Sequence, residues 1–235
     1  MLWNFESDYI INKTDYEVFV RCHDCDHPIS NYKVPRGKGG IAIIWPKLID
    51  KYIKRLEDGN NRIMAIEIQS TSKAICLVNT YLPTQMSGSV SEYRECLDII
   101  QTIIEKYEPT HEMVLCGDMN GILINDRNNA HDYKLKNIVK ENTLLHSDAL
   151  STQPTFFHHN GNSTSQIDYI SSSGSFINKN NILRQHATNT STHVPVVAEL
   201  CRCLPTSIQK SRIKECRNKI LWDKADQNQY QEILK

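Results

Sequence analysis

The stretch from Glu112 to Gly121 limits the fold of this chain more than any other. It reads EMVLCGDMNG: four apolar residues at 113–116, then a glycine, then polar side chains at Asp118 and Asn120. A short run of consecutive apolar residues is typical of a strand buried on both faces, and the glycine lets the backbone turn tightly after it. Open α/β sheets place their ligands at the carboxyl ends of such strands. The stretch therefore predicts a central strand of an α/β domain that ends at a polar site.

The two polar side chains suit phosphodiester chemistry. A carboxylate at Asp118 can accept a proton from water or hold a divalent cation, and a neutral amide at Asn120 can bond a phosphate oxygen without repelling it. Glycine, aspartate and asparagine are also the usual turn residues, so the motif alone is equally compatible with an ordinary turn. Partners elsewhere in the sequence are needed to choose between the two interpretations.

Length and charge exclude several classes of protein. The 235 residues suffice for one large domain with a tail, and 27 basic against 27 acidic residues give no net charge. A nucleic acid would therefore have to be bound by a local patch or through cations. No run approaches the ~20 apolar residues of a membrane span, and the first residues lack the apolar core of a signal peptide. We expect an intracellular protein, nuclear or cytoplasmic, without a membrane segment.

The eight cysteines are scattered, which favours reduced thiols. Cys22 and Cys25 form a C-x-x-C flanked by histidines. A structural zinc site needs four ligands, usually from two such pairs, and the other close pair, Cys201 and Cys203, has only one intervening residue. The spacing favours cysteines without a metal.

Periodicity places further elements around the central strand. Apolar alternation predicts strands at 17–22, 41–45, 62–70, 73–83 and 194–200, and a hairpin with an Asn-Gly turn within 156–173. Helical spacing predicts helices at 89–107 and near 131–141. The first helix begins with Ser89 and Glu92, which are spaced as a capping box.

The composition changes near the end of the chain. From Pro205 onward, basic residues outnumber acidic ones and large apolar residues become sparse. We therefore predict one domain at 1–203 and a helical tail or linker at 204–235.

Three further residues are candidates for the polar site. Asp168 lies in an apolar strand-like run, where a charge is costly unless it has a partner. His193, just before the last predicted strand, could be that partner, and the carboxylate would then orient the imidazole and raise its pKa. A histidine at such a position can equally be an ordinary surface or core residue. Tyr81 ends another strand, where its ring could close the core or its hydroxyl could reach a phosphate oxygen.

Five motifs occur in an informative order: RGKGGIAIIW at 36–45, NTYLP at 79–83, GDMNG at 117–121, QIDYI at 166–170 and S-x-H-x-P at 191–195. Together they resemble the endonuclease/exonuclease/phosphatase superfamily, and within it the apurinic-type endonuclease domain of non-LTR (LINE-like) retrotransposons. The likeness covers roughly residues 17 to 202. It implies a four-layer α/β sandwich of two packed mixed sheets flanked by helices. It also implies cleavage of a phosphodiester in DNA with Mg²⁺ or, alternatively, Mn²⁺, and a downstream reverse transcriptase domain as a partner.

The resemblance also implies a role for each candidate residue. Asp118 would activate or orient the attacking water, Asn120 would hold the phosphate and Tyr81 would contact it. Asp168 would pair with His193, which would stabilise charge on the phosphoryl oxygens. By the same likeness, Asp118, Asn120 and Asp168 would lie around the metal.

The sequence departs from the family pattern at two places. The family begins with one strand that carries an asparagine and another that carries a glutamate, the principal magnesium ligand, and neither has a counterpart here. We therefore expect the first strands of the fold to be missing. Thr192 stands where the family has an aspartate, and losing two anionic groups should weaken magnesium binding.

Three functions follow from this combination of motifs and departures. The first is a DNA endonuclease of retrotransposon type with doubtful activity. The second is an inactive remnant of the same fold that binds nucleic acid or protein. The third is a phosphatase that acts on a lipid or a nucleotide, because the fold alone does not distinguish it from a nuclease.

Overall fold

The computed structural model describes residues 15–24, 40–86, 88–124, 127, 129–146, 153–159, 161–184, 186, 189–201 and 204–205. The chain divides into two compact units, Met1–Pro205 and Thr206–Lys235, and every described residue belongs to the first. The tail predicted at 204–235 therefore stays a prediction. Cys22 is buried, whereas Cys25 and Cys203 lie outside the described residues.

A six-stranded mixed sheet organises the described residues. Its strands, in spatial order, are β3 (Ile53–Asn60), β4 (Ile63–Ile68), β5 (Ala74–Tyr81), β6 (His111–Asp118), β10 (Asp168–Ser172) and β7 (Leu145–His146). β5 and β6 run parallel, and the other neighbours run antiparallel. The predicted central strand is β6, and its residues Met113, Val114 and Leu115 are buried. The hairpin predicted from 62–70 and 73–83 is confirmed as β4 and β5.

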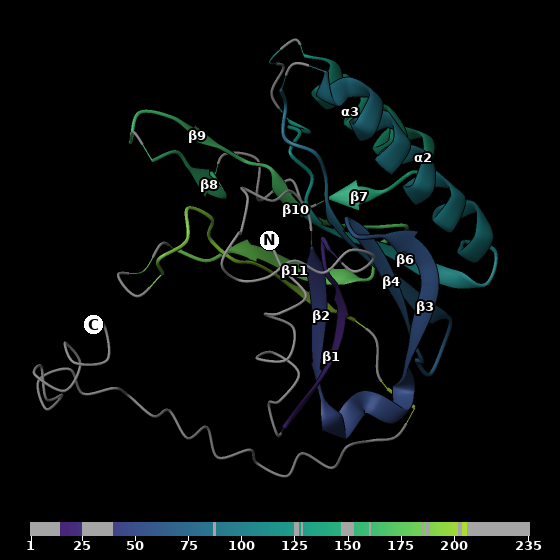
Figure 1. Ribbon diagram of the computed structural model, residues 1–235. Helices are drawn as coiled ribbons and strands as arrows, with labels where there is room; N and C mark the ends of the chain where they lie inside the picture. Colours follow the sequence, from purple (N-terminus) through teal and green to yellow (C-terminus); the bar gives the residue numbers. More distant parts are fainter. Residues whose placement is uncertain are drawn as a thin grey trace, which may run out of the picture. The chain divides into compact units, whose positions relative to one another are not determined.

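Two helices cover one face of this sheet. α2 (Ser89–Tyr107) and α3 (Ala130–Glu141) lie side by side over it (Figure 1). α2 has the bounds that its periodicity predicted, and its apolar side chains enter the main hydrophobic core. The predicted capping box does not form. Gly88 is the N-cap, the Ser89 hydroxyl donates to the Met86 carbonyl, and Glu92 instead accepts from Arg62.

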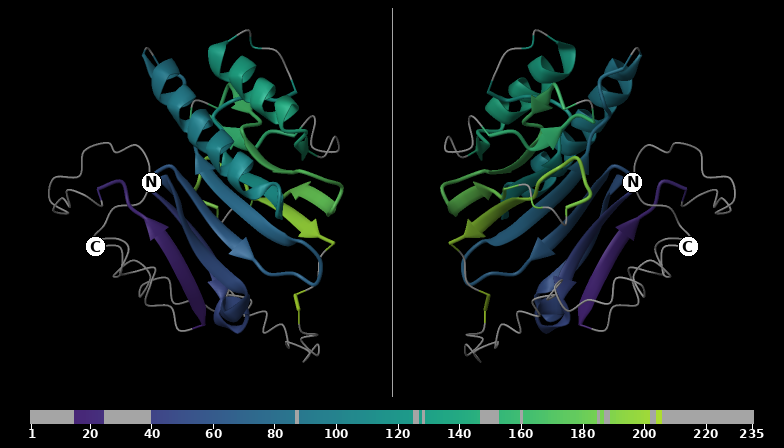
Figure 2. Two further views of the ribbon diagram at one scale, coloured as in Figure 1. Left: turned by 90° about the vertical axis from the view of Figure 1, so that its right-hand side faces the viewer. Right: turned by 90° about the vertical axis from the view of Figure 1, so that its left-hand side faces the viewer.

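Two short antiparallel sheets lie on the opposite face. One pairs β1 (Tyr16–Arg21) with β2 (Ile41–Pro46), and the other pairs β11 (Ile177–Ile182) with β12 (Val196–Leu200). The 3-10 helix η2 (Lys47–Tyr52) joins β2 to β3. In both views of Figure 2 the two pairs stand apart. The expected mixed α/β architecture is confirmed. Of the four expected layers, the described residues form one helical layer, one full sheet and this divided second sheet.

The region 156–173 differs from its prediction. β8 (Phe156–Phe157) pairs with a separate short strand, β9 (Thr164–Ser165), and not with the strand that carries Asp168. That strand, β10, joins the large sheet beside β6 instead. The reason is burial: Tyr169, Ser171 and Ser172 are almost inaccessible to solvent there, which a two-stranded hairpin alone would not provide. Within the described ranges, no helix is both long enough and apolar enough to cross a membrane.

Candidate functional site

The candidate site forms where three neighbouring strands end. Asp118 is the last residue of β6 and lies opposite Asp168, the first residue of β10, in the antiparallel register. Tyr81, the last residue of β5, is the parallel neighbour of Asp118. Gly117 allows this approach, because its φ of 122° is in the left-handed region and a Cβ there would collide with the Thr80 carbonyl. Tyr81, Asp118 and Asp168, all predicted as site residues, therefore lie at the same end of the sheet.

His193 reaches this edge from a loop and binds Asp168. Its Nδ1 lies 3.0 Å from Asp168 Oδ2 and 3.3 Å from Oδ1. An ionised carboxylate has no proton to donate and can only accept hydrogen bonds. His193 Nδ1 is therefore the donor, and Nε2 is left for another partner. The pairing predicted from the sequence is confirmed.

The loop that carries His193 is held by its own polar side chains. Ser191 Oγ accepts from the His193 N–H at 3.0 Å, and the Asn189 side chain donates to the His193 carbonyl at 2.7 Å. The Phe156 ring lies 5.0 Å from the imidazole, between ring centroids. These contacts fix both the backbone and one face of the ring.

Thr155 forms hydrogen bonds with the backbone beside both Asp168 and His193. Its buried hydroxyl oxygen accepts from the N–H groups of Ile167 and Asp168, at 3.0 and 3.1 Å. Its carbonyl accepts from the Val194 N–H, next to His193, at 2.8 Å. One residue therefore positions the backbone on both sides of the Asp168–His193 hydrogen bond.

Asn120 lies in the turn that follows β6. Its backbone N–H donates to Asp118 Oδ1 at 2.9 Å, and its side-chain amide donates to the Leu82 carbonyl at 2.7 Å. Its φ of 45° is in the left-handed region, which asparagine tolerates better than most residues. One amide hydrogen and the side-chain carbonyl oxygen are left for a further partner.

The pKa values of Asp118 and His193 are both shifted from their ordinary values. Burial raises the pKa of Asp118 to about 7, and the negative charge of Asp168 adds to the rise, while the Asn120 N–H and the charge of His193 oppose it. The hydrogen bond to Asp168 raises the pKa of His193 above its ordinary value, against the opposing effect of burial. Such perturbed groups, gathered at one edge, are typical of functional sites.

The same three side chains could hold a cation. One ligand atom from each of Asp118, Asp168 and His193 can be chosen so that all lie within 4.8 Å of one another. Carboxylate oxygens are the ligands that hard divalent cations prefer, and a cation would offset the burial and the charge of Asp168 that raise the pKa of Asp118. The donor set therefore fits a divalent cation.

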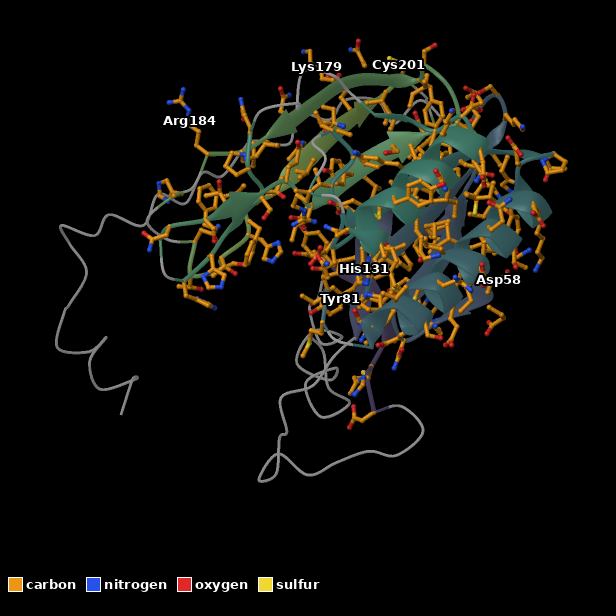
Figure 3. The ribbon with its side chains drawn as sticks, turned by 90° about the horizontal axis from the view of Figure 1, so that it is seen from above. Asp58, Tyr81, His131, Lys179, Arg184 and Cys201 are labelled. Atoms are coloured by element: carbon orange, nitrogen blue, oxygen red, sulfur yellow. The ribbon has the colours of Figure 1, made fainter. Side chains whose placement is uncertain are left out.

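A cavity of about 270 Å³ adjoins Tyr81. Its wall includes Arg62 and Glu92, which form an ion pair at 2.9 Å, and the Arg62 guanidinium lies 5.6 Å from the centre of the Tyr81 ring. Burial raises the pKa of Tyr81, as does the charge of Asp118, while Arg62 lowers it. Figure 3 shows Tyr81 well apart from Asp58.

All five predicted site residues therefore gather at one end of the sheet. The sequence did not reveal Thr155, Phe156 or Arg62 as members of the site. Phe156 follows Thr155 directly, and nothing in their spacing separates them from ordinary strand residues. Arg62 begins an apolar strand-like run. A charged residue at such a position was the only feature of the sequence that could have identified it as part of the site.

Comparison with known proteins gives matches only among solved structures. No protein-family model and no curated protein matches the sequence. The endonuclease domain of TRAS1, a telomere-specific non-LTR retrotransposon, is 18% identical with a TM-score of 0.58, over 79% of this chain and 80% of that one. The 3′ phosphatase NExo from Neisseria, bound to a product DNA hairpin, is 16% identical with a TM-score of 0.55, over 84% and 95%. An endonuclease/exonuclease/phosphatase family protein from Leptotrichia buccalis is 17% identical with a TM-score of 0.53, over 83% and 75%.

Proposed function

We propose that this chain is a phosphodiesterase domain that cleaves DNA weakly with Mg²⁺ or Mn²⁺. The premise is that the chain has the fold of the endonuclease/exonuclease/phosphatase superfamily. The observation that carries the proposal is the convergence of Asp118, Asp168 and His193, with His193 bonded to Asp168 at 3.0 Å. The order of motifs in the sequence favours the retrotransposon type of endonuclease within that fold.

The cation would be held by Asp118 and Asp168, and the side-chain oxygen of Asn120, in the turn just after β6, would be a third ligand. When bound, it supplies positive charge that neutralises the phosphoryl oxygens and positions the phosphate. The side chains of this protein would carry out proton transfer, charge stabilisation and binding of the phosphate.

His193 stabilises the charge that develops on the phosphate. Because Nδ1 donates to Asp168, the second nitrogen, Nε2, can donate to a phosphoryl oxygen. The raised pKa of the imidazole keeps more of it protonated near neutral pH than an isolated histidine would be.

Asp118 handles the proton of the attacking water. Without a cation its pKa is about 7, and a bound cation would lower that pKa and keep the carboxylate ionised, so that it can accept a proton. The remaining amide hydrogen of Asn120 and the Tyr81 hydroxyl donate to the phosphate. Both are neutral donors, so they do not repel it once the cation is bound.

We expect the activity to be low because the site is poor in carboxylates. Within the described ranges, Asp118 and Asp168 are the two acids in the cluster, and Thr192 supplies no charge. Each absent anionic ligand weakens magnesium binding. The cation would then be retained only at high concentration, and the phosphate would be positioned for less of the time.

Nicking of supercoiled plasmid DNA, with and without Mg²⁺, tests the proposal. We expect slow, Mg²⁺-dependent nicking that Thr192→Asp increases and that Asp118→Asn or His193→Ala removes. Fusing a segment with the family's two first strands and their glutamate should increase it further. The matched control is Asp58→Asn, which removes a carboxylate that is bonded to Lys106, near the far end of α2, and should leave nicking unchanged. Nicking that persists undiminished in Asp118→Asn would show that these roles are wrong.

The inactive-remnant alternative has its own outcome in this assay. If neither the chain nor its Thr192→Asp variant nicks DNA at any Mg²⁺ concentration, but the chain retards DNA in a gel, binding without catalysis is the function.

A further inference from the structure

A largely buried guanidinium lies beside Tyr81. The Arg62 side chain starts from the turn between β3 and β4 and is only 7% exposed. Arginine is rarely buried to this extent without a partner. Its partner is Glu92, in the first turn of α2, whose Oε1 accepts from Nε at 3.0 Å and from Nη2 at 2.9 Å. The helix therefore fixes the position of this guanidinium.

Arg62 contacts Tyr81 in three ways. The Arg62 carbonyl accepts from the Tyr81 N–H at 2.8 Å, and Arg62 Nη1 donates to the Tyr81 carbonyl at 3.3 Å. The guanidinium carbon also lies 5.6 Å from the centre of the Tyr81 ring, within the roughly 6 Å at which a cation attracts the face of an aromatic ring. Both backbone groups and the ring of Tyr81 are therefore held by one residue.

Tyr81 needs such contacts because β5 ends there. Its ring is only half-buried and forms part of the wall of the 270 Å³ cavity, so that part of the ring is not packed against protein. The next residue, Leu82, is held from the other side: its N–H donates to the Asp118 carbonyl at 2.9 Å, and its carbonyl accepts from the Asn120 amide. Arg62 and the turn after β6 thus fix neighbouring residues of one short segment.

Stability alone does not explain an arginine at this position. α2 already packs on the sheet through a stripe of buried apolar residues from Tyr93 to Ile104. Replacing a largely buried ion pair by apolar side chains of similar volume is often neutral or stabilising. Arginine differs from an apolar residue in its positive charge and in its rigid fork of donors, and both are directed at Tyr81.

The charge of Arg62 also affects the Tyr81 hydroxyl. Burial raises the pKa of Tyr81 and the charge of Asp118 raises it further, whereas the charge of Arg62 lowers it. A more acidic phenol is a better hydrogen-bond donor to an anion such as a phosphate. Arg62 therefore opposes the two effects that would make this hydroxyl a weaker donor.

We propose that Arg62, anchored by Glu92, is a positioning residue of the candidate site, which holds Tyr81 in place and strengthens its hydroxyl as a donor to the phosphate. The part that concerns the phosphate rests on the proposed function, whereas the action of Arg62 on Tyr81 does not. Arg62 itself does not contact the substrate. If it were only an anchor for α2, its replacement would change the stability of the fold and leave the Tyr81 hydroxyl unaffected.

Fluorine NMR of the full chain, labelled with difluorotyrosine, tests the action of Arg62 on Tyr81 without DNA or a cation. The fluorine atoms withdraw electrons, so the hydroxyl of this analogue titrates closer to neutral pH and the fold is not exposed to strong alkali. The chain has ten tyrosines, and the signal of Tyr81 is the one that Tyr81→Phe removes. We expect Arg62→Met to raise the midpoint of the Tyr81 titration by about one pH unit, because a nearby positive charge is lost.

Three further variants separate charge from packing. Arg62→Gln removes the charge but keeps a side chain that can donate, so it should raise the midpoint as Arg62→Met does, and it replaces that variant if Arg62→Met does not fold. Arg62→Lys keeps the charge and should titrate close to the wild type. The matched control is Arg55→Met, the same change in a guanidinium that lies 5.5 Å from the Trp45 ring, on β3. It should leave the Tyr81 midpoint unchanged.

The nicking assay tests the consequence for catalysis. Arg62→Met should lower kcat about tenfold and change KM by less than about twofold, because the Tyr81 hydroxyl acts on charge that develops in the transition state. Arg62→Lys should restore part of the loss, and Arg55→Met should nick DNA like the wild type.

Two results would overturn the inference. One is an unchanged Tyr81 midpoint in a folded Arg62→Met or Arg62→Gln protein, and the other is an equal rise of the midpoint in Arg55→Met. Circular dichroism of each variant establishes that it is folded. If the wild type does not nick DNA at all, the proposed function fails, whereas the fluorine titration still decides whether Arg62 acts on Tyr81.

Discussion

Replacing Asp118 by asparagine should stabilise the protein above a pH of about 7 and leave its stability almost unchanged near a pH of about 4. Burial and the charge of Asp168 raise the pKa of this carboxyl from its ordinary 3.8 to about 7. Between those values the folded state keeps a proton that the unfolded state releases. The wild type therefore loses stability as the pH rises through this window, and the loss is complete above the folded pKa. Asparagine does not ionise, so the variant escapes the loss.

The size of the effect follows from the shift. A pKa raised from 3.8 to about 7 corresponds to about 4 kcal/mol of unfavourable free energy for the ionised group. Asp118 is only partly shielded from solvent, and screening reduces this to about 2 kcal/mol. For a domain of this size, that difference raises the melting temperature by about 4–8 °C.

Urea unfolding without divalent cations, at several pH values between about 4 and 8, measures this difference. The control is Asp58→Asn, for which the sign is opposite. Although burial opposes it, hydrogen bonds from Lys106 and Tyr107 hold the pKa of Asp58 below its ordinary value. Its contribution is present above the unfolded pKa and lost in acid, so Asp58→Asn should destabilise the protein at neutral pH. A stability difference between Asp118→Asn and wild type that is the same at both ends of the pH range would refute the reasoning.

Two further substitutions test the backbone around the site. Gly117→Ala should prevent folding or cost on the order of 3 kcal/mol or more, because its Cβ would collide with the Thr80 carbonyl, whereas Gly88→Ala, also at positive φ but in open space, should cost only about 1 kcal/mol. Tyr93→Phe removes the hydroxyl that donates to the buried Met119 carbonyl at 2.9 Å, and should lower the free energy of unfolding by about 1–3 kcal/mol in the same urea assay. A soluble Gly117→Ala protein as stable as Gly88→Ala, or a Tyr93→Phe protein as stable as wild type, would contradict the respective argument.

The elements that the sequence predicted well are those whose burial is complete. β6 buries Met113, Val114 and Leu115 in succession, so its apolar residues are consecutive, and α2 buries one full stripe along 19 residues. β3 and β11 escaped prediction because each buries only one residue, Leu56 and Asn180 respectively. β11 reads Ile-Asn-Lys-Asn-Asn-Ile, in which only Asn180 is buried, so no apolar alternation marks it.

Only some residues of the candidate site could be predicted from the sequence. Asp168 was predictable because a charge in an apolar strand needs a partner, and His193 was the polar residue in reach of a strand end. Thr155 acts by accepting hydrogen bonds: its hydroxyl oxygen accepts from two backbone N–H groups, and its carbonyl accepts from a third. Such contacts depend on where the chain returns in space, and they leave no periodic mark in the sequence.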